Sequence, residues 1–269
     1  MPVNLLYVEG ELDEQLLTSV FAGTPVVQKR GTKYGLQGIV VRDRADTDNN
    51  AIFFLRDRDF DFEPNEASPH LPTPMTTPRS GVQVGWRWYR HCTECYLLEP
   101  ALAAAALERP QPELEDLVRQ AAQSLANYQA ARWAIGQVRN RLPPSRQLET
   151  HPPELQGEFA LPQDMSEQGN WNWLSSSTRA FIQPAAAAFE QDAVRLSFDH
   201  YKTRLACLDV VDILVWFSGK DLLTYIAPRL GNESPGAVRN RLRNWVRLHP
   251  DETLVVLPEW TALKQLLSQ

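Results

Sequence analysis

Residues 3–10, VNLLYVEG, and residues 51–59, AIFFLRDRD, each place an apolar run directly before acidic residues. An apolar run of this length before a turn is typical of a buried parallel strand. Between them, residues 12–22 carry apolar side chains at helical spacing and residues 25–27 begin another apolar run, while residues 34–44 form a helix candidate that two glycines weaken. This order predicts an α/β fold, a Rossmann-like parallel sheet with helices on both faces.

The rest of the chain is expected to be mostly helical. Five prolines exclude regular structure from residues 63–80, and a strand follows at residues 82–88. Residues 142–170 form a second proline-rich stretch, and residues 253–257 are a short strand candidate. Helices are expected at residues 94–108, 112–141, 178–202, 205–217 and 235–248, with a last one from Glu259. We therefore expect an α/β domain at residues 1–108 and a mostly helical region at residues 109–269, whose C-terminal segment returns to the first domain.

The composition excludes several classes of protein. Among 269 residues, 43% are hydrophobic and 22% charged, which suits a packed core rather than wholesale disorder. No run approaches the roughly 20 apolar residues of a membrane span. The first four residues lack the basic start of a signal peptide. A cytoplasmic protein without a membrane partner is therefore expected.

The three cysteines, Cys92, Cys95 and Cys207, are too few and too uneven in number for a disulfide framework. Cys92-x-x-Cys95 has the spacing of half a zinc site. No second cysteine pair or histidine pair completes it, so two half-buried thiols are favoured over a structural zinc.

Carboxylates are expected to gather at the carboxyl edge of the sheet. Glu9 follows the first strand, and Asp57 and Asp59 follow the third. Carboxyl ends of neighbouring parallel strands meet at one edge, and an extended strand end would point Asp57 and Asp59 to the same side. Such a group repels itself unless a cation lies within it, and Mg²⁺ prefers these ligands. A metal site for displacement at phosphorus is one interpretation. A solvated acidic loop is the alternative, and it suits Asp61 and Glu63 better.

Four short motifs follow one another along the chain: Val8-Glu9-Gly10, with Asp13 soon after it, Asp57-x-Asp59, RHCTECYLL at residues 90–98, and FSGKDLL at residues 217–223. The first two resemble the metal-binding Toprim domain of topoisomerases, primases and OLD-family nucleases. All four in this order resemble a Toprim-like family of bacterial defence proteins that includes the nuclease effector of the PARIS anti-phage system. The resemblance spans nearly the whole chain.

The resemblance implies a catalytic role for several acidic residues. Cys95 stands where the family usually has Asn, so any support from that Asn is absent or altered. Glu9 would be the general base or a metal ligand, Asp57 and Asp59 would ligate Mg²⁺ (or Mn²⁺), and Glu94 would be a further acidic ligand.

Basic residues provide candidates for nucleic-acid contact. Residues 219–247 hold six basic and two acidic side chains. Arg239, Arg243 and Arg247 recur every four residues on one helix face, and with Lys220 they could contact phosphates. A solvated face that pairs with the acidic N-terminal third is the slightly favoured alternative. Lys33 lies where the family has a Gly-Gly-Lys-like turn, which could face a phosphate; a surface lysine fits equally well.

Two further sequence features are not interpreted as functional sites. Gly219-Lys220 lacks the first glycine and the Ser/Thr of a Walker A loop, which argues against ATP binding by this chain. Trp86, Trp88 and Tyr89 could stack on bases, but aromatic residues in a strand are more often core.

The function expected from these observations is a Mg²⁺-dependent nuclease acting on DNA or RNA, and the resemblance implies a role in anti-phage defence. A separate ATPase partner is expected because the chain lacks its own ATP site, and a homo-oligomer stays open. The alternative is a non-catalytic Toprim-like binding module that partners an ATPase sensor. A topoisomerase or primase fragment is less favoured, because neither a strand-passage domain nor a polymerising context is seen. The net charge of −6 then reflects metal ligands in the first 66 residues rather than excluding nucleic acid.

Overall fold

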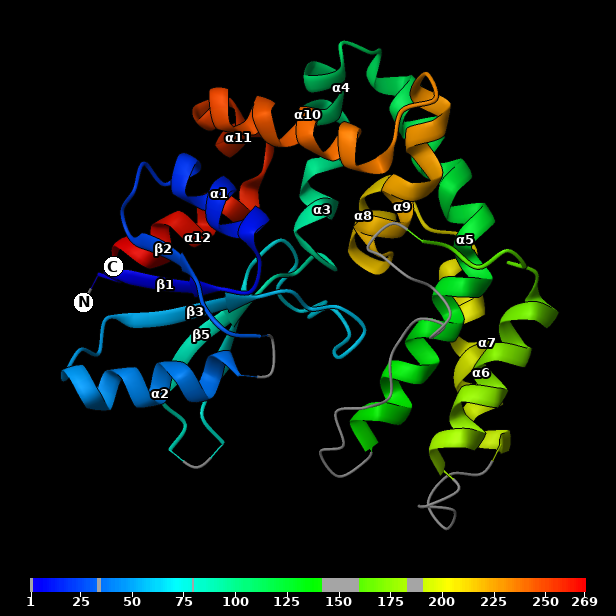
Figure 1. The fold of residues 1–269 in the computed structure, drawn as a ribbon, viewed down its shortest axis with the longest axis horizontal. Helices are drawn as coiled ribbons and strands as arrows, with labels where there is room; N and C mark the ends of the chain where they lie inside the picture. Colours follow the sequence, from blue (N-terminus) through cyan, green and yellow to red (C-terminus); the bar gives the residue numbers. More distant parts are fainter. Residues whose placement is uncertain (1, 33–34, 79, 142–159, 183–190) are drawn as a thin grey trace. The chain divides into compact units, whose positions relative to one another are not determined.

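The computed structural model describes residues 2–32, 35–78, 80–141, 160–182 and 191–269. The chain forms two compact units (Figure 1). The first unit comprises Met1–Arg58, Pro64–Gln111 and Arg239–Gln269, and the second comprises Asp59–Glu63 and Pro112–Val238. This division differs from one at residue 108 in two ways: residues 239–269 belong to the first unit, and residues 59–63 belong to the second. No described helix combines the length and apolar character that a membrane span requires.

A five-stranded sheet forms the centre of the first unit. Its strand order is β2-β1-β3-β5-β4, and all neighbouring pairs are parallel except β4 with β5. The mostly parallel α/β sheet predicted from the sequence is therefore confirmed, and it is compatible with a Rossmann-like fold. The strands are β1 (Leu5–Val8), β2 (Val26–Lys29), β3 (Ile52–Arg56), β4 (Thr73–Thr76) and β5 (Gln83–Arg87).

Helices cover both faces of this sheet. Alternate residues of a strand point to opposite faces, so Tyr7 and Phe54 pack with Leu36 and Val40 of α2 (Leu36–Thr47) in one hydrophobic cluster. Figure 1 shows α1 (Glu11–Val20) and α12 (Pro258–Ser268) on the other face. The Val3 N–H donates to the Leu267 carbonyl at 2.9 Å, which ties the start of β1 to the end of α12.

The strand β4 shows that the expectation of no regular structure in residues 63–80 is wrong. Pro74 lies opposite Trp86 in the antiparallel pair with β5. Because β4 is an edge strand, no strand is hydrogen-bonded to its outer side. The missing N–H of Pro74 therefore costs no hydrogen bond on that side. The prolines of this stretch argue against a central strand, but they are compatible with an edge strand.

The helices of the first unit also differ from the sequence expectations. Residues 94–108 form two helices, because Pro100 starts a second one: α3 (Thr93–Leu97) and α4 (Pro100–Leu107). The strand expected at residues 253–257 is wrong. Those residues lie in or just after α11 (Pro250–Val256), which has Pro250 at its first position and Asp251 and Glu252 in its first turn.

The second unit is helical and is organised around Trp133, which is fully buried. The Trp133 ring lies 5.2–5.4 Å from the rings of Phe60, Tyr201 and Trp216. Gly136 of α5 allows residues 59–63 to pack closely on this helix. A Cβ atom at this position would lie only 2.0 Å from the Phe60 carbonyl oxygen. The helices are α5 (Gln111–Arg141), α6 (Glu167–Ile182), α7 (Gln191–Leu205), α8 (Val210–Trp216), α9 (Gly219–Ile226), the 3₁₀ turn η2 (Ala227–Leu230) and the start of α10 (Pro235–Leu248).

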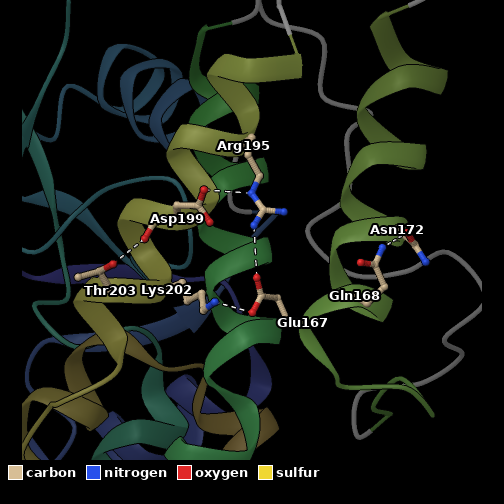
Figure 2. A network of polar contacts seen from close by, with 7 residues as sticks. All are labelled: Glu167, Gln168, Asn172, Arg195, Asp199, Lys202 and Thr203. Atoms are coloured by element: carbon tan, nitrogen blue, oxygen red, sulfur yellow. Dashed lines mark hydrogen bonds and ion pairs between the residues drawn. The ribbon is translucent and has the colours of Figure 1, made fainter.

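The long helix predicted at 112–141 and the one at 235–248 are confirmed. The single helix predicted at 178–202 is wrong: α6 begins at Glu167, within the stretch expected to be proline-broken, and α7 is separate from it. Most of that proline-rich stretch, residues 142–159, lies outside the described residues. Figure 2 shows how ion pairs join the two helices, with Glu167 of α6 accepting from Arg195 and Lys202 of α7.

Candidate metal centre

Glu9 and Asp57 meet at the carboxyl edge of the sheet. Glu9 directly follows β1, Asp57 directly follows β3, and these strands are parallel neighbours. The Asp57 backbone N–H donates to Glu9 Oε1 at 3.2 Å. Arg56 Nε also lies 3.9 Å from this Glu9 oxygen, so a buried cation adjoins the acidic pair. The proximity of Glu9 and Asp57 that strand order predicts is confirmed.

Thr93 joins Asp57 to a further carboxylate. The Thr93 N–H donates to Asp57 Oδ1 at 3.1 Å, and its hydroxyl lies 3.4 Å from the same oxygen. That hydroxyl also donates to Asp13 Oδ1. Asp13 in turn accepts the Gly10 N–H through Oδ2 at 3.0 Å. The start of α1, the end of β3 and the start of α3 are thereby tied together by one threonine and two carboxylates.

Asp13 and Thr93 are site neighbours that the sequence analysis did not include among its ligands. Asp13 stands three residues after Gly10, at the position from which a carboxylate caps the helix start. This spacing is the local sequence signal from which the position of Asp13 can be predicted. Thr93 offers no such signal, because its partners are 36 and 80 residues away in the sequence.

Glu94 is buried, with 3% of its surface exposed, next to Thr93 in α3. Its Oε1 lies 3.8 Å from Arg239 Nη1 of α10. A carboxylate this deeply buried needs a positive partner, and Arg239 provides it. This ion pair is the kind of contact expected if the basic face pairs with acidic groups of the N-terminal part.

The other members of the basic stripe have different surroundings. Arg243 donates through Nη1 to Gln15 Oε1 of α1 at 3.1 Å, whereas Arg247 is exposed. Lys220 is half-buried in the first turn of α9, in the second unit. Arg239 lies at ion-pair distance from a candidate ligand, Glu94.

Asp59 and Lys33 are the two remaining site residues predicted from the N-terminal part of the sequence. The strand β3 ends at Arg56 and Asp59 has a φ of 49°, so the extended geometry that would align Asp59 with Asp57 is wrong. Asp59 also belongs to the second unit. Lys33 lies outside the described residues.

The cysteine pair lies beside the acidic group. Cys92 and Cys95 are fully buried rather than half-buried, with their Sγ atoms 3.7 Å apart. Burial raises the pKa of the Cys92 thiol well above its usual range, and the contact with Cys95 and the charges of Glu94 and Asp57 add to this. The Cys92 thiol therefore behaves as a core side chain rather than as a nucleophile, and Cys95 is buried beside it.

A buried carboxylate supports the segment that precedes α3. Glu259 of α12 accepts the Tyr89 N–H at 2.6 Å and the Tyr96 hydroxyl. Trp88 stacks on Trp260 with ring centroids 5.9 Å apart. Trp86, Trp88 and Tyr89 are all buried, which confirms that these aromatics are core.

The donor set at this edge fits Mg²⁺ chemically, because Glu9, Asp13 and Asp57 offer hard carboxylate oxygens. Within the described residues, no group of three or more His, Cys, Asp or Glu side chains is placed to hold a metal ion. Mg²⁺ is commonly held by one or two carboxylates, with waters and phosphate oxygens completing its shell. Glu9 and Asp57 provide two carboxylates at this edge for a site of that smaller kind.

No protein-family model matches the sequence, and no curated protein matches it significantly. We therefore infer the function from the motifs and from the contacts around Glu9, Asp57 and Glu94.

Proposed function

We propose that this chain is a Mg²⁺-dependent nuclease of the Toprim-like type that cleaves phosphodiester bonds in DNA or RNA. The observation that carries the proposal is the pairing of Glu9 with Asp57 at the carboxyl ends of β1 and β3. Ligand sites of open parallel sheets lie at this edge. The motif resemblance assigns catalytic roles to the same two residues.

Glu9 and Asp57 would hold the cation, and the motif resemblance adds Glu94 as a further acidic ligand. When bound, Mg²⁺ stabilises the charge that develops on phosphate oxygens. Glu9 would accept the proton of the attacking water as general base. Thr93 fixes the orientation of Asp57 through its N–H and hydroxyl. Arg239 beside Glu94 supplies a positive charge suited to a phosphate.

The biological part of the proposal follows from the resemblance. We propose an effector role in bacterial anti-phage defence, in the cytoplasm, together with a separate ATPase as partner. Co-purification from a host that carries the neighbouring genes tests the partnership. Full cleavage activity of the isolated chain, without any ATPase, would count against a required partner.

A cleavage assay tests the enzymatic proposal. Supercoiled plasmid and a structured RNA are incubated with the full chain and Mg²⁺ or Mn²⁺, next to Glu9→Gln and Asp57→Asn. We expect at least a hundredfold loss in both variants, since each removes a charge that the reaction requires. Glu11→Gln is the matched control, because Glu11 is exposed two residues from Glu9 and should leave the rate unchanged. Equal activity of wild type and both site variants would refute the nuclease.

A non-catalytic binding module is the second candidate, and one observation favours it. Each proposed carboxylate already has a protein partner: Glu9 accepts from Asp57, Asp57 from Thr93, and Glu94 faces Arg239. Such contacts can hold a scaffold together without a metal. A wild type that neither cleaves nucleic acid nor binds divalent cations, but captures an ATPase partner, would support the module.

A further inference from the structure

A cavity of about 570 Å³ lies in the first unit, away from the acidic edge. It is lined by residues of β3, β4 and β5, of the loop before β4, and of α12, together with Val3. Val3 precedes β1, so the cavity reaches the amino ends of the parallel strands, whereas Glu9 and Asp57 follow their carboxyl ends. Its volume falls within the range of small-molecule sites, roughly 300–1,000 Å³.

The side chains of the lining are uncharged, although the Arg44 guanidinium lies 4.2 Å from the Phe53 ring centroid. None of the described side chains that line the cavity is ionisable. A phosphate, carboxylate or ammonium group would find no charged side chain in this lining to replace the water that it loses. The cavity therefore selects against charged ligands and favours an uncharged one.

The aromatic part of the lining favours a planar ligand. Phe53 and Trp86 lie on neighbouring strands with ring centroids 5.1 Å apart and planes inclined by 33°. Trp86 is 5% exposed, so it forms a fixed wall rather than a mobile side chain. Phe53 is half-buried, so a planar heterocycle can gain apolar burial and a ring contact there, next to the buried Trp86.

The polar part of the lining favours amide-like hydrogen bonding. Asn65, Gln83, Gln265 and Gln269 contribute side-chain amides. The Asn65 amide oxygen already accepts the Ala67 N–H and the Gln83 amide nitrogen donates to the Gly85 carbonyl, whereas Gln265 is exposed. An amide carries a donor and an acceptor side by side, which is the pattern that pairs with the edge of a nucleobase. Neutrality, aromatic walls and several amides together describe a site for an uncharged, planar, hydrogen-bonding heterocycle.

We propose that this cavity is a binding site for an uncharged nucleobase or nucleoside. The site is independent of the proposed nuclease reaction, because it shares no residue with the acidic edge. It would bind its ligand in the absence of metal ions and in variants of Glu9 or Asp57.

The experiment is a calorimetric titration of the full chain, without metal, with adenosine, guanosine, cytidine and uridine in turn. At least one nucleoside should bind with a dissociation constant on the order of 0.1 mM, the strength that ligand efficiency predicts for a ligand of this size. Inorganic phosphate, as the charged probe, should neither bind nor compete. If all four nucleosides fail to bind, or if phosphate displaces the one that binds, the proposal is overturned.

Two variants locate the binding. Ala262→Phe places a ring in the cavity and should weaken binding at least tenfold. Gln265→Ala removes one amide from an exposed position of α12, so it should leave the fold intact and weaken binding about fivefold, as the loss of one hydrogen bond predicts. Gln120→Ala on α5 is the matched control and should bind like wild type. Unchanged affinity in Gln265→Ala together with Ala262→Phe would contradict the assignment.

Discussion

Thr93 is the residue through which three segments of the candidate metal centre are held together. Its hydroxyl contacts both Asp13 and Asp57, while its N–H bonds to Asp57 independently of the side chain. Thr93→Val keeps the shape and the N–H but removes the hydroxyl. We predict a cleavage rate about tenfold lower at a fixed Mn²⁺ concentration, because partners that orient metal ligands contribute at this level.

Thr93→Ser is the control for this prediction. It retains the hydroxyl and should restore most of the rate, which a role in β-branched packing alone would not. A Thr93→Val protein that cleaves as fast as wild type would show that the hydroxyl does not position the carboxylates.

Glu259 gives the molecule a predicted pH dependence. Burial raises the pKa of Glu259 from 4.5 to about 7, against the lowering effect of the hydrogen bonds from Tyr96 and Tyr89. Between these values the folded chain keeps the proton that the unfolded chain releases. The free energy of unfolding should therefore fall as pH rises from 4.5 to 7, by about 3 kcal/mol from this residue alone.

Glu259→Gln tests that dependence, because it keeps a neutral amide at the position at every pH. In urea unfolding series at pH 4.5, 6 and 7.5, the variant should lack the part of the slope that Glu259 causes in wild type. Glu108→Gln, at an exposed site, should retain the wild-type slope. Parallel slopes for wild type and Glu259→Gln would mean that Glu259 does not titrate in this range.

At the scale of elements, the pairing of β3 with β5 depends on a glycine. A Cβ at Gly85 would lie 2.3 Å from the Phe54 carbonyl oxygen and 2.7 Å from its ring. We predict that Gly85→Ala lowers the free energy of unfolding by about 3 kcal/mol, because the two strands must separate to admit the methyl group. Gly38 in α2 has no atom within 4 Å of its Cβ position, so Gly38→Ala should stabilise by up to about 1 kcal/mol. Urea unfolding measures both, and equal effects would contradict the account.

The elements that the sequence predicted well are those whose pattern is local. Apolar runs at β1 and β3 and helical spacing in α1 and α5 appear in the structure close to the expected bounds. The sequence does not predict the edge strand β4, because prolines usually interrupt strands. Pro74 removes only an N–H, and an edge strand does not need that donor on its outer side. The helix α11 was mistaken for a strand because five mostly apolar residues suit either structure, and Pro250 at the helix start decided between them.

At the scale of the whole molecule, part of the candidate site was predictable and part was not. Strand order alone brings Glu9 to Asp57, because parallel neighbours share an edge. The ion pair of Glu94 with Arg239 joins residues that are far apart in the sequence, and no local pattern predicts it. Asp57 and Asp59 are two residues apart, yet they belong to different units, since residues 59–63 pack on α5. Motif spacing does not reveal such a division.

The central claim is that Glu9 and Asp57 hold a divalent cation at the carboxyl edge of the sheet. Calorimetric titration of the full chain with Mn²⁺, without nucleic acid, tests it most directly. We predict that wild type binds Mn²⁺ and that Asp57→Asn binds it at least tenfold more weakly. Asp48→Asn, at an exposed helix end, should bind like wild type. Absence of Mn²⁺ binding by wild type, or equal affinity in Asp57→Asn, would contradict the account.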